Sequence, residues 1–548
     1  MPDQQPSAAD TGMSLATVWE SVADTVPDAA ALVQGDLVRT WAEFDDRAAR
    51  LAAYLDAAGV GPDAKLACYL YNGPEYLEAT FAAFKVRAAP INVNYRYLEA
   101  ELEYLLDNAD AEAVVFDVEF ATRLEHVRPA LGKVKVWLCV GADAEHALPD
   151  WAVDYESTIS ATLPMQRIER SGNDLWFLYT GGTTGMPKGV MWPHRNLLAT
   201  AAATFAVVKL PVPSTPAEVS DAVAAFHEQG RAVRLLPAAP LMHGTSAITA
   251  VAVLSAGGTV VTLTSRSFDA DELCRAVERH RVTQLTIVGD AFAKPIVAAL
   301  DRARDAGTPY DVSSLKIVVS SGVMWSALAK EELLQFCSAT LVDSLGSSEG
   351  VGFASSVARK GETAPTAKFS LGEFARVFTE AGDEVAPGSG ERGLLAVGGP
   401  IPIGYYKDPD KSAETFRTFA GRVWSVPGDW ATVELDGTIT LLGRGSVCIN
   451  TAGEKVYPEE VEETLKLHPA VQDCNVVGLP DEKWGQSVTA VVALAGDDDV
   501  TGAAELVAHC KEHLAGYKCP KRIVFVDRVQ RGPNGKPDYR WAAEVAGT

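Results

Sequence analysis

Apolar residues recur with two different periods along this chain, and segments with the two periods alternate. Apolar positions at helical spacing cover residues 14–25 and 41–58, whereas short, continuously apolar runs cover 65–70 and 89–93. Helical spacing predicts helices with one buried face, and the short apolar runs predict strands buried on both faces. Because parallel strands need long crossover connections, which helices usually supply, the alternation predicts parallel sheets covered by helices on both faces.

The same two periods predict most of the remaining elements before residue 325. Further helices are expected at 75–86, 99–108, 270–280 and 290–304, further strands at 113–116, 134–140, 235–243, 285–289 and 315–324, and a hairpin at 30–40. The stretch 200–234 has a mostly helical pattern that three prolines between residues 210 and 216 interrupt, and 248–263 predicts a helix followed by a strand.

The pattern changes after residue 388, where glycine becomes frequent and the apolar runs shorten. Strands expected at 393–397, 403–406, 426–429 and 438–442 predict a β-rich subdomain. The last hundred residues mix helices at 457–465 and 503–515 with strands at 471–479, 487–494 and 522–526. Since 548 residues are too many for one core, we predict an α/β protein. A large N-terminal domain of helix-covered sheets with the β-rich subdomain (1–445) precedes a small α+β C-terminal domain (446–548).

Composition and charge narrow the classes of partner. Hydrophobic residues make up 47% of the chain and charged residues 22%, which is typical of a globular protein. The polar first dozen residues do not resemble a signal peptide, and no apolar stretch is long enough to span a membrane, so we expect a cytoplasmic protein. A net charge of −24 disfavours nucleic acids and anionic membranes as partners. The eight cysteines form no Cys-x-x-Cys pair and have no adjacent histidine cluster, so they indicate neither zinc nor a disulfide framework.

The most distinctive stretch of the chain is the loop Tyr179-Thr-Gly-Gly-Thr-Thr-Gly-Met-Pro-Lys-Gly189, between apolar strands expected at 175–178 and 190–192. Backbone N–H groups, hydroxyls and a lysine at close range suit an oligophosphate. A Walker loop is excluded because Pro187 precedes the lysine and a strand follows it. The alternative is a plain hairpin turn, which needs fewer residues. The expected phosphate contacts are Thr180, Gly181, Gly182, Thr183, Thr184, Gly185 and Lys188.

This loop resembles the phosphate loop of the adenylate-forming superfamily, which contains acyl-CoA synthetases, peptide-synthetase adenylation domains and firefly luciferase. In that family an acid attacks the α-phosphate of ATP, and the resulting acyl-adenylate is passed to a thiol. The resemblance implies ATP, Mg²⁺ and coenzyme A (CoA) as cofactors. It also implies that the small C-terminal domain is mobile.

Further motifs follow in the order of that family. Ser344-Leu-Gly-Ser-Ser-Glu349 resembles its Tyr-Gly-x-Thr-Glu motif, so that Ser348 and Glu349 are expected to hold a phosphate oxygen and Mg²⁺. Ser344, Leu345 and Gly346 are expected at the nucleotide, although Leu345 stands where the family has a tyrosine that stacks on adenine. From sequence alone, Ser-Ser-Glu could equally cap a helix.

Three further places resemble nucleotide contacts of the family. Ser321, Gly322 and Val323 end an apolar run, and the resemblance implies adenine there, the alternative being a plain strand-to-helix turn. Asp429, after Pro-Gly, matches a ribose-binding carboxylate, and Arg444 matches an arginine that reaches ribose or phosphate. From sequence alone, Asp429 could instead stabilise the turn in which it lies, and Arg444 could form a surface salt bridge. Lys455 is assigned a phosphate contact only.

The resemblance also supplies a catalytic lysine and an acid pocket. Lys536, in Asn534-Gly-Lys536, matches the family lysine that binds both the acid and the α-phosphate, whereas the local sequence alone is equally typical of a solvated charge at a loop tip. His243 matches a residue that lines the acyl pocket, with Gly289 and Gly322 as further pocket positions. Gly453 is expected to line the CoA channel. Ser446 stands at the domain pivot, where the family usually has Asp or Lys.

Together these motifs predict an acyl-CoA ligase that activates an apolar carboxylic acid. The spellings Gly443-Arg-Gly-Ser-Val447, Ala452-Gly-Glu-Lys-Val-Tyr-Pro458 and Gly535-Lys-Pro-Asp-Tyr539 are most similar to bacterial ligases of steroid side-chain or related bulky acids. The alternatives are a medium- or long-chain fatty acid–CoA ligase and an acyl-AMP ligase that loads a carrier protein. The sequence leaves a homodimer open.

Overall fold

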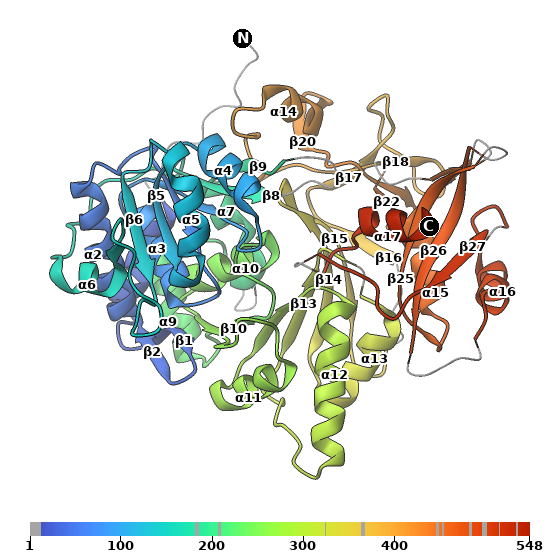
Figure 1. Ribbon diagram of the computed structural model, residues 1–548, viewed down its shortest axis with the longest axis horizontal. Coiled ribbons are helices and arrows are strands. Elements are labelled where there is room, and N and C mark those ends of the chain that lie inside the picture. Colours follow the sequence, from blue (N-terminus) through green and yellow to red (C-terminus); the bar gives the residue numbers. More distant parts are fainter. Residues whose placement is uncertain are drawn as a thin grey trace.

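The structure is a computed structural model of the full chain. It describes residues 13–180, 186–206, 210–323, 325–362, 368–444, 449–451, 454–481, 485–495, 501–514, 516–532 and 535–547. Among these residues, no helix is both long enough and apolar enough to cross a membrane. The described chain forms three sheets and the helices that cover them (Figure 1).

The first sheet contains the strand that precedes the predicted phosphate loop. Its strand order is β7-β6-β5-β3-β4-β8-β9, and all neighbours are parallel except β8 and β9. Its strands are β3 (Lys65–Tyr69), β4 (Ala89–Asn92), β5 (Ala111–Asp117), β6 (Val136–Val140), β7 (Val153–Asp154), β8 (Leu175–Thr180) and β9 (Lys188–Pro193). The antiparallel β8–β9 pair confirms that a strand follows the loop, as the sequence predicts.

The second sheet joins the parallel layer to the β-rich region. Its parallel part runs β1-β11-β10-β12-β13-β14, and every further pairing from β14 through β15, β16, β22, β21 and β18 to β20 is antiparallel. Its first strands are β1 (Ala30–Gln34), β2 (Leu37–Thr40), β10 (Arg234–Pro237), β11 (Thr259–Thr262), β12 (Gln284–Ile287), β13 (Ile317–Ser321) and β14 (Thr340–Ser347). The others are β15 (Gly350–Ala358), β16 (Lys368–Leu371), β17 (Ala375–Phe378), β18 (Arg392–Val397), β19 (Phe416–Phe419), β20 (Arg422–Ser425), β21 (Asp429–Val433) and β22 (Thr438–Arg444). The predicted β-rich subdomain therefore continues the second sheet.

Helices begin where the sequence supplies capping groups. Thr40 and Glu43 form a capping box at the start of α2, and Ser14 caps α1. The longer helices of the large domain are α1 (Leu15–Thr25), α2 (Trp41–Ala57), α3 (Pro74–Lys85), α4 (Glu99–Asn108), α9 (Pro216–Glu228), α10 (Gly244–Ser255), α11 (Ala270–His280), α12 (Asp290–Asp305) and α13 (Ala327–Phe336). The shorter ones are α5 (Ala121–Val127), α6 (Tyr155–Ala161), α7 (His194–Thr200), α8 (Ala202–Ala206) and α14 (Pro409–Thr415). The largest core cluster packs Trp19, Phe44, Phe81 and Phe84 from three of these helices against each other.

The third sheet forms the small C-terminal domain, drawn in orange and red at one end of the molecule (Figure 1). Its strands are β23 (Ile449–Thr451), β24 (Glu454–Val456), β25 (Val471–Asp481), β26 (Gly485–Leu494) and β27 (Arg522–Phe525), and its helices are α15 (Pro458–Lys466), α16 (Ala503–His513) and α17 (Tyr539–Gly547). The long β25–β26 hairpin packs on α15, and β27 adds parallel to β26. The predicted α/β class, with a large domain and a small one, is confirmed.

Three local predictions were wrong, each for an identifiable reason. The expected strand 235–243 ends at Pro237, because Pro240 and a turn lead directly into α10. Residues 403–406 form a single bridge at Tyr405, and 426–428 are a turn before β21. The motif 344–349 lies on β14 and the turn into β15, which excludes the alternative that it caps a helix.

Candidate active site

Two adjoining cavities, of about 280 and about 290 Å³, lie where the ends of β8, β13 and β14 meet the small domain. Seven residues line both of them: Thr180, Gly322, Ser344, Gly346, Ser347, Ser348 and Lys536. In open α/β sheets, ligands bind beyond the carboxyl ends of the parallel strands, and Thr180 and Gly322 stand at or just beyond such ends. The shared wall therefore gathers residues from the predicted phosphate, adenine and lysine motifs at one place.

The first cavity is bounded by both sheets of the large domain. Its apolar lining is Leu105, Leu178, Met242, Ile248, Val288, Val319 and Val351. Its polar lining includes Asn92, Asn94, Tyr97, His243, Thr245, Thr249 and Ser321. Apolar and polar surface contribute nearly equally to this lining, so a small molecule bound there would contact both.

His243 and Lys536 both line this cavity. The pKa of the imidazole is lowered to about 4, mainly by burial, and the nearby charges of Lys536 and Arg96 contribute in the same direction. Its Nε2 is buried, without a hydrogen-bond partner in the part of the chain that is described. At neutral pH His243 is therefore an uncharged side chain with one ring nitrogen available to a ligand.

The second cavity lies between the two domains. Its large-domain wall includes Val323, Trp325, Leu345, Phe353, Phe369, Glu349 and Asp429. Its small-domain wall is a face of α15 with Glu459, Glu460, Glu462, Glu463 and Lys466, together with Arg531, Lys536 and Tyr539. Leu345 stands where the resemblance implies a tyrosine that stacks on adenine. Trp325, Phe353 and Phe369 supply flat apolar surface in the same cavity.

The turn between β14 and β15 presents Ser348 and Glu349 to the second cavity. Their backbone is fixed from two sides, since Trp192 Nε1 donates to the Ser348 carbonyl at 2.8 Å and Ser425 Oγ donates to the Glu349 carbonyl at 2.7 Å. The hydroxyl of Tyr405 donates to Glu349 Oε1 at 2.7 Å. A hydroxyl and an oriented carboxylate on a cavity wall are hard oxygen donors, and they fit Mg²⁺.

Lys536 reaches the shared wall from a compact loop of the small domain. Arg531 pairs with Asp473 through two short bonds and donates from Nη1 to the Gly535 carbonyl at 3.1 Å, and the Gly532 N–H donates to the Lys536 carbonyl at 2.8 Å. Gly535 has φ +72°, and a Cβ there would lie 3.2 Å from Ala291 Cβ, so only glycine allows this approach to α12. The loop is therefore fixed to β25 of its own domain and lies close to α12 of the large domain.

Several predicted residues lie elsewhere or are not described. Lys188 is paired with Asp408 and lines neither cavity. Gly289 precedes α12 with φ +53°, one residue after Val288 on the cavity wall, and its N–H donates to Ser320 Oγ at 2.9 Å. For Arg444 and Lys455 only the backbone is described, at the end of β22 and in β24. Gly181, Gly182, Thr183, Thr184, Gly185, Ser446 and Gly453 lie outside the described residues.

The sequence did not reveal a group of buried charges beside the second cavity. Lys330 Nζ lies 3.2 Å from Asp343 Oδ2, and both side chains are buried. Burial raises the pKa of Asp343 to about 6 and that of Glu463 to about 7, although Lys330 opposes both shifts. Glu463 Oε1 is buried and has no hydrogen-bond partner among the described residues. In the sequence, the four acids in the first turns of α15 are explained by the helix dipole, which favours negative charge at a helix N-terminus. The group of buried charges becomes visible only when α15 packs near Lys330.

A buried asparagine was also missed. Asn92 Oδ1 accepts from the Tyr179 N–H at 2.6 Å, and its Nδ2 donates to the Tyr179 and Met242 carbonyls at 2.8 and 2.6 Å. This side chain joins the end of β8 to the residue before His243. A polar residue ending an otherwise apolar strand was the available signal.

Comparison with known proteins shows the family of the chain. A family model described as AMP-binding enzyme matches residues 19–406, and that of the AMP-binding enzyme C-terminal domain matches residues 460–536. The 3-oxocholest-4-en-26-oate–CoA ligase of Rhodococcus rhodochrous is 40% identical over 98% of this chain and 96% of that protein. The medium/long-chain-fatty-acid–CoA/3-oxocholest-4-en-26-oate–CoA ligase of Mycobacterium tuberculosis is 42% identical over 97% of this chain and 96% of that protein.

A solved structure shares the fold over nearly the whole chain. The anthranilate CoA ligase AuaEII in complex with anthranoyl-AMP has a TM-score of 0.83 at 21% identity, covering 98% of both chains. The predicted superfamily, the enzyme class and the use of ATP, Mg²⁺, CoA and a carboxylic acid are confirmed. The chain therefore belongs to the AMP-binding enzymes, as an ATP-dependent, AMP-forming ligase of the acyl-CoA synthetase type.

Proposed function

We propose that the acid is a bulky apolar carboxylate of the steroid side-chain type. The observation that carries this proposal is that 3-oxocholest-4-en-26-oate is named for both relatives, which share about 40% of their residues with nearly the whole chain. The name of the Mycobacterium tuberculosis relative also includes medium/long-chain fatty acids. The apolar lining of the first cavity is compatible with such an acid. A second candidate, a medium- or long-chain fatty acid, is favoured by the cavity itself. Its volume of about 280 Å³ is at the lower limit of pockets that enclose drug-sized ligands.

We assign the first cavity to the acid and the second to the nucleotide. With this assignment the acid's carboxylate meets the α-phosphate at the shared wall, where Lys536 offsets the repulsion between two anions. A carboxylate oxygen bonds to the α-phosphorus, and the bond to pyrophosphate breaks. Neutral His243 lines the acid's path without adding a competing charge. Asp429 is assigned to ribose, and Val323 and Leu345 to adenine.

Phosphate and metal contacts complete the proposed site. Thr180 and the loop 181–185 would contact the β- and γ-phosphates, with Lys188 released from Asp408 to join them. Ser348 and Glu349 would hold Mg²⁺, which neutralises phosphate charge when bound. Tyr405 keeps the Glu349 carboxylate oriented toward it.

The second half-reaction, in which the CoA thiol attacks the adenylate carbonyl and AMP leaves, requires Lys536 to withdraw. We propose that the domain boundary lies at 445/446 and that Ser446 is the pivot, with Gly453 beside the thiol. We also propose that the protein works in the cytoplasm. A carrier-protein loading ligase would share the first half-reaction but not react with free CoA.

The test is AMP release by the purified protein from a panel of acids, with and without CoA. We expect AMP release that depends on both acid and CoA, with a steroid side-chain acid giving the highest kcat/KM. A higher value for a straight-chain acid would select the second candidate. If none of the acids in the panel supports AMP release in the presence of CoA and Mg·ATP, the proposal is contradicted.

A further inference from the structure

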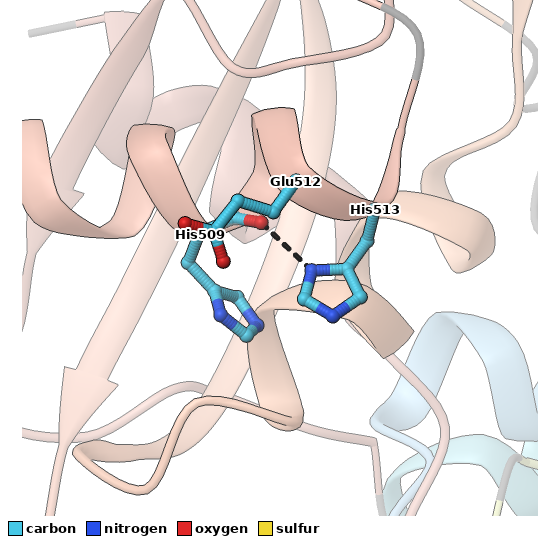
Figure 2. A group of neighbouring side chains, drawn as sticks. All are labelled: His509, Glu512 and His513. Carbon is cyan, nitrogen blue, oxygen red and sulfur yellow. Dashed lines mark hydrogen bonds between the residues drawn. The ribbon is translucent and has the colours of Figure 1, made fainter.

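The small domain carries a group of potential metal ligands on helix α16 (Figure 2). None of these side chains lines either of the two cavities. His509, Glu512 and His513 follow one another at i, i+3 and i+4, so they share one face of the helix. One ligand atom from each side chain lies within 4.8 Å of those of the other two. Three of the nine histidines in the chain gather here, because His468 at the end of α15 packs its ring 5.2 Å from that of His509.

Backbone carbonyls fix how both imidazoles are protonated. His509 Nε2 lies 2.9 Å from the Thr464 carbonyl, and His513 Nδ1 lies 2.9 Å from the His509 carbonyl. A carbonyl accepts only, so each of these nitrogens carries the proton in the neutral ring. The other nitrogen, Nδ1 of His509 and Nε2 of His513, then keeps a lone pair. Metal-binding histidines are usually oriented by this kind of second hydrogen bond.

A bound metal ion would draw the ligand atoms together from their present spacing of up to 4.8 Å. Zn–N bonds of about 2.0–2.1 Å place two tetrahedral ligand atoms roughly 3.3 Å apart. Glu512 and His513 are exposed, so small rotamer changes can close the difference. The spacing His509-Cys-Lys-Glu512-His513 is also one in which the two histidines of a class of metallopeptidases bind zinc. Two imidazoles and a carboxylate favour zinc, nickel or copper ions over Mg²⁺ or Ca²⁺.

We propose that His509, Glu512 and His513 form a binding site for a divalent transition-metal ion. The site has three protein ligands, and water completes the coordination. It stands apart from the proposed Mg²⁺ site and does not depend on it. The His509–Thr464 hydrogen bond joins this group to α15, the helix that faces the second cavity.

The test is titration of the full chain, carrying no polyhistidine tag, with ZnCl₂ in excess MgCl₂, followed by calorimetry. We expect one zinc ion per chain, and affinities at least about tenfold lower in His509→Ala and in His513→Ala, since even outer-shell substitutions cost about 10–100-fold. Glu512→Gln should weaken binding while keeping the shape of the side chain. His146→Ala is the matched control, because it removes an exposed histidine beside a carboxylate, Asp143, and should change nothing.

A second measurement identifies the ligands directly. Bound Cu²⁺ should show spin-resonance coupling to two imidazole nitrogens in the parent and to one in either histidine variant. All variants should release AMP at the parental rate with Mg²⁺ alone, which verifies that they are folded. Absence of saturable zinc binding, or undiminished binding by the His509→Ala/His513→Ala double variant, would overturn the proposal. The described cysteines are all buried, so exposed thiols among them do not compete for the metal.

Discussion

Two groups of buried charges, one in the scaffold and one beside the nucleotide cavity, are built in opposite ways. In the scaffold group, Lys85 Nζ contacts Glu20 Oε1 at 2.7 Å and Asp45 Oδ1 at 2.6 Å, and Arg170 binds both oxygens of Glu20. In the cavity group, Lys330 is paired with Asp343, while Glu463 Oε1 has no partner among the described residues. Burial without full pairing raises the pKa of Asp343 and Glu463 toward neutrality.

The difference shows where the fold tolerates incompletely paired charge. Glu20, Lys85 and Arg170 are buried among α1, α3 and the chain before β8, and full pairing offsets the cost of burial there. Asp343 and Glu463 line a cavity between two domains, so their surroundings change when a ligand enters or the domains separate. Perturbed acids are typical of functional sites for this reason.

The largest expected effect is on the scaffold. Lys85→Met leaves the Glu20 and Asp45 carboxylates without one of their cations, so the free energy of unfolding of the large domain should fall by about 3–5 kcal/mol. Urea denaturation measures it. Lys368→Met is the control, because Lys368 and Asp436 form an exposed pair, and it should leave the midpoint unchanged. If the denaturation midpoint falls equally in the two variants, the buried ion pairs contribute no more to stability than the exposed pair does.

The next effect comes from the cavity group and depends on pH. The folded-state pKa of Glu463 is raised from 4.5 to about 7, so the neutral carboxyl favours the folded state at low pH, and this contribution is lost as pH rises through about 7. Glu463→Gln keeps an uncharged group at every pH. It should therefore stabilise the protein at pH 8 by about 1–2 kcal/mol and change little at pH 4.5.

Thermal unfolding at several pH values between 4.5 and 8 tests this prediction. The Glu463→Gln variant should show a flatter dependence of the midpoint on pH than the parent. Glu331→Gln, at an exposed position of α13, should follow the parent curve. A Glu463→Gln variant that is destabilised at pH 8 would mean that the ionised carboxylate has a stabilising partner in the folded protein.

The smallest effect concerns the orientation of Glu349. Tyr405→Phe removes the hydroxyl that donates to Glu349 Oε1 and leaves the ring packed against Phe416. We expect about a tenfold increase in the Mg²⁺ concentration needed for half-maximal AMP release, with little change at saturating Mg²⁺. Tyr406→Phe is the neighbouring control, since its hydroxyl bonds Asp110 outside the two cavities. If both variants show the same Mg²⁺ dependence, the Tyr405 hydroxyl does not contribute to Mg²⁺ binding.

Much of the fold was predictable because it depends on local sequence. The period of apolar residues placed α2 and β3, and the Gly-Thr-rich loop was correctly expected between two strands. The joining of β16 to β22 was not predictable, because this antiparallel pairing links segments far apart in the chain. A short apolar run predicts a strand but does not indicate which other strand it pairs with.

The site was predictable as far as its residues form contiguous motifs. Thr180, Gly322, Ser348 and Lys536 come from four motifs and line the same wall. The raised pKa of Glu463 depends on burial against Lys330, which no local pattern encodes. The proposed site on α16 was missed for a different reason. The sequence was judged to have no histidine cluster beside a cysteine, but Cys510 stands between His509 and His513.

The central claim is that the small domain delivers Lys536 to the wall shared by the acid and nucleotide cavities. The most direct test compares the two half-reactions in Lys536→Ala. We predict that acid-dependent pyrophosphate release falls by at least about a thousandfold, because a charge that offsets repulsion between two anions is lost. Conversion of preformed acyl-adenylate and CoA to thioester should continue at close to the parental rate. Equal loss of both half-reactions, or parental pyrophosphate release, would contradict the account.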